Sequence, residues 1–195
     1  MTAVTDNSQH FPYTKAMKNK VIRWGQERLT THLFKDEKKA VLEKLGQLEN
    51  ALNNLQYEGK LFSSGHINKA EDVVRFLKKK YTAHIKLDNN IIFPFLERHI
   101  PKLHPVLLYL RAERREFQEG FKIFEETLSE LKRGNKDVIR HGIIGRLKDR
   151  GIYLICLMRS HIQLEEQSVY EGITRGLHKD EKSALIQKVV HFMQS

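Results

Sequence analysis

The stretch HIKLDNNIIFP at residues 84–94 places a histidine four residues before an aspartate and then continues into apolar residues. A similar arrangement, a histidine four residues before an acid, occurs again in HIQLEEQSVYE at residues 161–171. Residues at positions i and i+4 of an α-helix project from one face of that helix, one turn apart. The two stretches therefore predict two helices that each direct an imidazole and a carboxylate to the same side.

The sequence around these motifs is rich in Leu, Lys, Glu and Ala, and the 195 residues include only four prolines. Apolar residues recur at spacings of three and four, which is typical of amphipathic helices, and no alternating apolar run indicates a sheet. The pattern predicts a leading segment at about 12–30, four long helices at 32–57, 68–93, 104–133 and 137–173, and a short helix at 179–194. Turns are expected at 57–68, between Pro94 and Pro101, and at 132–135.

Four long helices with short connections favour an all-α fold, an antiparallel up-down four-helix bundle. We expect an N-terminal extension at 1–30, the bundle at 31–174 and the short C-terminal helix within 175–195. The chain also contains an internal repeat, because KDEKKAV at 35–41 is similar to RAERREF at 111–117. Two related helical hairpins would bring their polar residues to one level of the core.

The formal charge of +10 and the pI near 9.6 raise the question of a nucleic-acid partner. The basic residues are scattered along faces that are also rich in Glu, and no zinc finger or Gly-rich phosphate loop is visible, so a nucleic-acid partner is not indicated. No apolar run reaches the roughly 20 residues that cross a bilayer, so no membrane association is expected. We expect a cytoplasmic protein.

The single cysteine, Cys156, lies in the apolar run GIYLICLM and is expected to be a buried, inert thiol. A lone cysteine allows no disulfide within the chain, which agrees with a reducing compartment. No Ser-His-acid motif is visible. The sequence therefore favours a binding protein over an enzyme and leaves the question of catalysis open.

The repeated motifs supply four candidate metal ligands, His84, Asp88, His161 and Glu165. Imidazole nitrogen and carboxylate oxygen are ligands that suit iron or manganese. A buried set of this kind also needs a cation, a proton or hydrogen-bond partners to be tolerated in a core. The pattern therefore predicts a polar centre in which a cation neutralises the acids.

HIKLDNNIIFP and HIQLEEQSVY resemble the second-helix and fourth-helix motifs of hemerythrin-like (HHE cation-binding) domains. LFKDEKKAVLEKL and LRAERREFQEGF are similar to that family's first-helix and third-helix motifs. The resemblance covers roughly residues 30–173. It implies a four-helix bundle with a non-haem iron centre, mononuclear or dinuclear, that binds or senses dioxygen, nitric oxide or iron itself.

The sequence departs from the family pattern at three places. Lys38 and Arg114 stand where the first and third helices of the family each offer a histidine, and Asp88 stands where Glu is usual. His32 is the remaining histidine of the first helix, but it lies six residues before Lys38 and is off the inward face of a helix of 3.6 residues per turn. We keep His32 only as a weak ligand candidate.

Three interpretations remain open. Lys38 and Arg114 could neutralise Asp88 and Glu165 in a salt-bridge network that replaces the iron centre. The chain could instead keep an iron site with a reduced ligand set. Finally, the two cations could lie at the edges of their helix faces and extend to water. The alternative function is a metal-free helical adaptor or regulatory module that binds a protein or polyanion partner.

Overall fold

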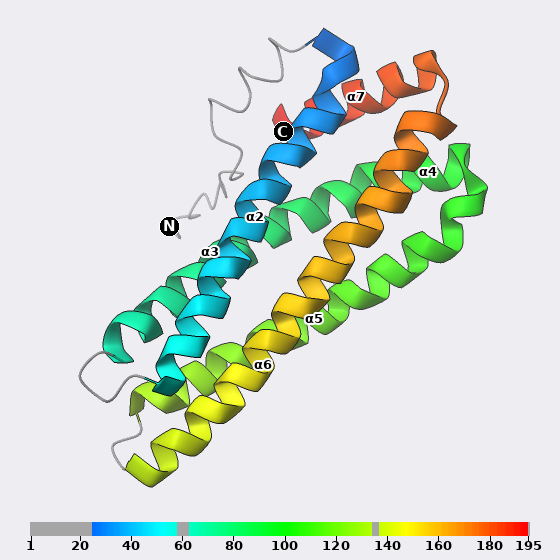
Figure 1. The fold of residues 1–195 in the computed structure, drawn as a ribbon. Coiled ribbons are helices and arrows are strands. Elements are labelled where there is room, and N and C mark those ends of the chain that lie inside the picture. Colours follow the sequence, from blue (N-terminus) through cyan, green and yellow to red (C-terminus); the bar gives the residue numbers. More distant parts are fainter. Residues whose placement is uncertain (1–24, 58–62, 134–136, 195) are drawn as a thin grey trace, which may run out of the picture.

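The structure, a computed structural model, describes residues 25–57, 63–133 and 137–194, and the side chains of 38–55, 64–133 and 141–194. These residues are helical almost throughout and contain no strand (Figure 1). The predicted leading segment falls largely outside the described residues. None of the helices described is long and apolar enough to cross a membrane.

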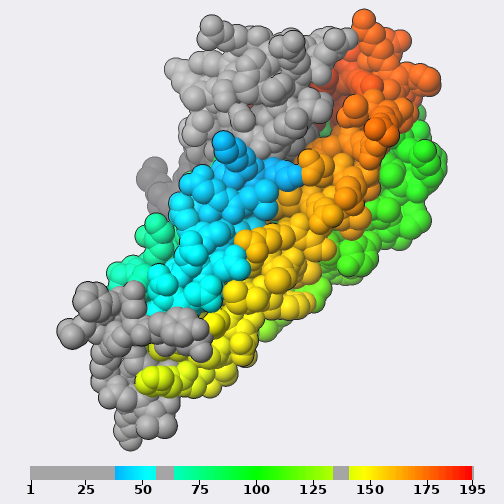
Figure 2. All heavy atoms as spheres, viewed as in Figure 1, coloured from blue at the N-terminus to red at the C-terminus, as the bar shows by residue number. Residues whose placement is uncertain are grey.

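Four long helices form the bundle: α2 (Gly25–Tyr57), α3 (Ser63–Leu87), α5 (His104–Arg133) and α6 (Asp137–Leu164). Within the bundle the main contacts follow the cycle α2, α3, α5, α6 and back to α2. In Figure 2 the atoms of α2, in blue to cyan, lie beside those of α6, in yellow to orange. The predicted all-α bundle is confirmed.

The second helix is longer than predicted at both of its ends. α3 begins at Ser63, within the stretch expected to be a loop. It continues through a π-helical turn at Asp88–Ile92 into α4 (Phe93–His99), and a 3₁₀ turn at Pro101–Leu103 then leads into α5. Pro94 does not end the helix because it lies in the first turn of α4, where its missing N–H is not needed.

The fourth helix ends in the same manner as the second. α6 passes into π-helical segments at Glu165–Tyr170 and Gly172–Gly176, so the helical region extends three residues beyond the predicted end at 173. α7 (Lys179–Gln194) then follows, as predicted. The carboxylates of both repeated motifs, Asp88 and Glu165, are therefore the first residues of π-helical segments. Such segments occur frequently at functional sites.

The core consists of two apolar clusters. The larger cluster lies within α2, α3, α5 and α6 and includes Leu52, Leu77 and Phe124. The second cluster lies at the other end of the bundle, where α7 packs against the π-helical turn after α3, and it includes Leu96 and Leu185. The residues of the repeated motifs lie where the two clusters meet.

The prediction that Cys156 is buried is wrong, because its side chain is exposed on α6. Its neighbours Leu154, Ile155 and Met158 take the inward positions of that helix. The run GIYLICLM is apolar on nearly all sides, so its composition alone does not distinguish the inward from the outward face.

Candidate functional site

Five charged or polar side chains with relative exposures of 2–4% meet in the core of the bundle: Asp88, Glu113, Arg114, His161 and Glu165. His84 joins them with a side chain that is 19% exposed. Unpaired charges are very costly in such a place, so their mutual contacts decide whether the cluster is tolerated. His84 and His161 lie on α3 and α6, and Glu113 and Arg114 lie on α5. Asp88 and Glu165 are the first residues of the π-helical segments after α3 and α6.

Arg114 joins the two repeated acids. Its Nη2 atom donates to Asp88 Oδ2 and to Glu165 Oε1, the latter at 3.0 Å. Its Nη1 atom donates to Asn89 Oδ1 at 3.1 Å, and the guanidinium carbon lies 4.3 Å from the centre of the Phe93 ring. One guanidinium therefore bridges carboxylates from two helical segments and is itself held on an aromatic face.

His84 faces the same two carboxylates. Its Nε2 atom lies 3.2 Å from Asp88 Oδ2 and 3.1 Å from Glu165 Oε2. His84 on α3 and Asp88 at the start of the following π-helical turn are four residues apart on one face, as the sequence predicted, and Glu165 meets them from the π-helical segment after α6. One ligand atom from each of these three residues can be chosen so that all three lie within 4.8 Å of one another.

His161 is oriented by an acid that the sequence analysis missed. Its Nδ1 atom lies 2.8 Å from Glu113 Oε2, within hydrogen-bonding distance. The other nitrogen, Nε2, is 3.2 Å from Glu165 Oε1 but has no hydrogen-bond partner. The ring of His161 therefore lies between two buried carboxylates, Glu113 at Nδ1 and Glu165 at Nε2. A carboxylate behind one ring nitrogen is the arrangement found around histidines that bind metals.

The close contacts shift the protonation equilibria of the cluster. Burial by itself would lower the pKa of His84, but the carboxylates of Asp88 and Glu165 outweigh it and raise this pKa to about 10. Burial and the neighbouring Glu165 raise the pKa of Asp88 to about 6, against the opposite effect of His84 and Arg114. Burial also acts to raise the pKa of Glu165, but His84 and His161 hold it well below its usual range. Without a metal, His84 is therefore an imidazolium at neutral pH.

Lys38 has a different partner from the predicted one. Its ammonium pairs with Glu166, and the side chain is 26% exposed, so it does not neutralise Asp88 or Glu165 by direct contact. A long lysine side chain can reach the protein surface at little cost, and Glu166 offers an exposed carboxylate there. His32 lies in α2 but outside the residues whose side chains are described.

The spacing of apolar residues on α5 already contains a signal for Glu113. Apolar spacing from Leu110 to Phe117 passes through position 114 with steps of four and three, and equally through position 113 with steps of three and four. Both residues are buried, so α5 directs an acid and a base into the core side by side. Only the contact with His161 distinguishes the role of Glu113.

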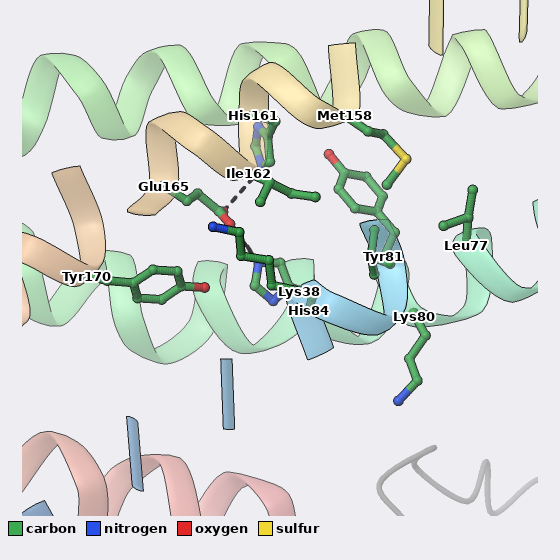
Figure 3. A pocket seen from close by; sticks show the side chains of 11 residues that line it. Lys38, Leu77, Lys80, Tyr81, His84, Met158, His161, Ile162, Glu165 and Tyr170 are labelled. Atoms are coloured by element: carbon green, nitrogen blue, oxygen red, sulfur yellow. Dashed lines mark hydrogen bonds and ion pairs between the residues drawn. The ribbon is translucent and has the colours of Figure 1, made fainter. Parts of the chain in front are cut away.

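A cavity of about 60 Å³ adjoins the cluster. Its lining combines apolar side chains from α2, α3 and α6 with the polar side chains of His84, His161 and Glu165 (Figure 3). Lys38, Lys80 and Tyr170 also line it. The site thus combines a set of nitrogen and oxygen ligands with adjacent space for a small molecule.

The sequence was compared with models of known protein families. A model of the hemerythrin HHE cation binding domain matches residues 29–173. No curated protein matches the chain at a significant level. The matched residues contain all of the polar cluster, and they end before α7.

Proposed function

Because the chain belongs to the hemerythrin HHE cation-binding domain family, we propose that it binds one transition-metal ion, with iron(II) as the ion best suited to its ligands. The observation that carries this proposal is the position of Arg114 on the two acids. A dinuclear centre needs both acids to be shared between two ions, and here a guanidinium occupies part of that place. One metal ion and one guanidinium would then divide the carboxylate oxygens between them.

The remaining donor atoms fit one ion. His84, Asp88 and Glu165 offer a nitrogen and two oxygens close together, and Nε2 of His161, 3.2 Å from Glu165 Oε1, would supply a second nitrogen. Glu113 would act behind this set by fixing the ring of His161. A bound iron(II) ion would supply a centre that takes up dioxygen or nitric oxide, and the adjoining cavity supplies space for such a ligand.

Binding of the metal ion requires that His84 be deprotonated, and the neighbouring acids oppose this. His84 must lose its proton before it can bind a metal, and its raised pKa opposes this loss. Metal binding is therefore expected to release a proton and to become tighter as the pH rises from 6 to 9.

The test is an anaerobic titration of the metal-free protein with iron(II), and with cobalt(II) as a spectroscopic probe. We expect one ion per chain, and at least a tenfold loss of affinity in His84→Ala and in Glu165→Gln. His66→Ala is the matched control, because His66 lies on α3 away from the cluster. Two ions per chain would contradict the proposed division between metal and guanidinium.

A second candidate function is favoured by the same guanidinium. Arg114 and the imidazolium of His84 already neutralise two of the three buried acids, so the bundle can be stable without a metal. The chain would then be a metal-free helical module whose partner is a protein or a polyanion. Absence of stoichiometric metal binding in the titration would select this function.

A further inference from the structure

Lys38 spans the space between two elements that line the cavity. It lies on α2, and its ammonium pairs with Glu166 in the π-helical segment Glu165–Tyr170. Lys38 itself belongs to the lining of the cavity, together with Tyr170 of the same segment. The side chains of Lys38 and Glu166 are 26% and 49% exposed. The ion pair therefore joins α2 to the segment after α6 on the surface side of the cavity.

The cavity has a buried inner end and a partly exposed outer end. The lining residues removed from water are Leu77, Tyr81, Met158, His161 and Glu165. The half-buried polar ones are Lys38, Lys80, His84 and Tyr170. In Figure 3 the Lys38 side chain extends across the view of His84 and Glu165, and the Tyr170 hydroxyl is directed toward the same place. Lys38 therefore lies at the end where the cavity meets the surface.

This outer end is also where the polar cluster comes closest to water. The side chain of His84 is 19% exposed, whereas those of Asp88, His161 and Glu165 are 6% exposed or less. A molecule that enters from solvent therefore meets His84 before the other three side chains. While the ion pair is closed, the Lys38 side chain lies beside this route, and its ammonium repels an arriving cation. Lysine has a flexible stem, so rotation toward water clears the route.

We propose that the Lys38–Glu166 ion pair is a gate over this cavity. The gate is closed in the structure, and it opens when the ammonium leaves Glu166 and turns to solvent. Ion pairs between partly exposed side chains are weak, so the gate slows the passage of small molecules and does not prevent it. Access to the cavity does not depend on a metal; only the second experiment, release of a metal ion, rests on the proposed function.

The first experiment measures access to the cavity in metal-free protein. Met158 lies at the buried inner end, so Met158→Cys places a thiol there, and Cys156→Ser removes the exposed natural thiol. The rate at which methyl methanethiosulfonate, a small neutral reagent, modifies the introduced thiol reports the opening. In this parent protein, Lys38→Met and Glu166→Gln should each raise the rate about twofold to fivefold, the range expected for loss of a partly exposed ion pair. The exchange Lys38→Glu with Glu166→Lys rebuilds the pair with reversed charges and should return the rate to that of the parent.

Two features of the design separate a gate from other effects. Lys38→Met and Glu166→Gln change the local charge with opposite signs, so a purely electrostatic effect would move their rates in opposite directions. Arg159→Met is the matched control, because Arg159 on α6 pairs with Glu49 on α2 at 2.7 Å, and neither residue lines the cavity. This variant should react at the rate of the parent.

The second experiment loads the wild-type chain and the same gate variants with cobalt(II) and follows release of the ion to excess EDTA. Both single variants should release it about twofold to fivefold faster, and the charge exchange should restore the wild-type rate. If the wild type takes up no cobalt(II), the proposed metal function fails and the thiol rates alone decide the inference. If Met158→Cys does not fold, cobalt(II) release decides it. The inference is overturned if Lys38→Met is no faster than its parent, or if the charge exchange is as fast as the single variants.

Discussion

At the scale of single residues, Arg114 supplies a positive charge that pairs with two acids of the buried cluster. It contacts Asp88 and Glu165 with one nitrogen and is 3% exposed, whereas the nearby Arg111 pairs with Glu97 at a side-chain exposure of 31%. The two arginines are both on α5 and both lie over the ring of Phe93. They differ mainly in how far their partners are removed from water.

This difference predicts unequal costs of removal. In the metal-free protein at pH 7, Arg114→Met should lower the free energy of unfolding by about 3–5 kcal/mol, because it removes one of the two cations that pair with the buried carboxylates of Asp88 and Glu165. Arg111→Met removes a partly exposed ion pair and should cost at most about 1 kcal/mol. Urea unfolding followed by circular dichroism measures both values. Equal losses of stability in the two variants would show that the buried ion pairs of Arg114 contribute no more than the partly exposed pair of Arg111.

At the scale of elements, the close approach of α6 to its neighbours positions His161 and Glu165. Gly151 marks this approach, because a Cβ atom there would come within 2.2 Å of Leu52 Cδ1 and 2.9 Å of Phe124 Cε2. Both of those side chains are buried. The residue is glycine because α2, α5 and α6 are packed too closely at this level for a side chain.

Gly145 on the same helix provides the contrast, because a Cβ atom there has nothing within 4 Å. Gly151→Ala should lower the free energy of unfolding by about 1–3 kcal/mol through overpacking. Gly145→Ala should raise it by about 0.5–1 kcal/mol, because alanine favours helix over glycine. Thermal unfolding of the two variants tests the pair, and a stabilising Gly151→Ala would contradict the close packing.

At the scale of the whole molecule, α7 completes the end of the bundle that holds Asp88. It lies outside the residues matched by the family, yet it packs against α2 and against the π-helical turn at Asp88–Ile92 (Figure 1). Leu185 and Val189 of α7 belong to the same apolar cluster as Ile92 and Phe93. The last helix is therefore expected to support the turn on which Asp88 is placed.

Truncation of one α7 side chain tests this coupling. Leu185→Ala removes a side chain that is 1% exposed and should lower the free energy of unfolding by about 2–5 kcal/mol. It should also increase amide hydrogen exchange at residues 88–92. Lys188→Ala on the exposed face of α7 is the control and should change neither quantity. If Leu185→Ala destabilised only α7 itself, with exchange at residues 88–92 unchanged, the support would be absent.

The amino-acid sequence by itself determined the helical class, most of the helix limits and the pairing of a histidine and an acid on one face in two helices. It could do so because the 3.6-residue period and the i, i+4 spacing are local properties of the chain. The ends were less certain, because the π-helical turns before Pro94 and after Leu164 depend on packing at the site. The inward or outward direction of Cys156 on an evenly apolar helix was likewise not local information.

Only the tertiary structure decided which charges meet. Arg114 contacts both acids, Lys38 contacts Glu166, and Glu113 orients His161, although spacing alone made Lys38 and Arg114 equivalent. The physical reason is that the partner of a charged side chain depends on depth from the surface and on neighbours from other helices. The cavity beside Tyr81 has the same origin, because unfilled space arises only when four helices pack together.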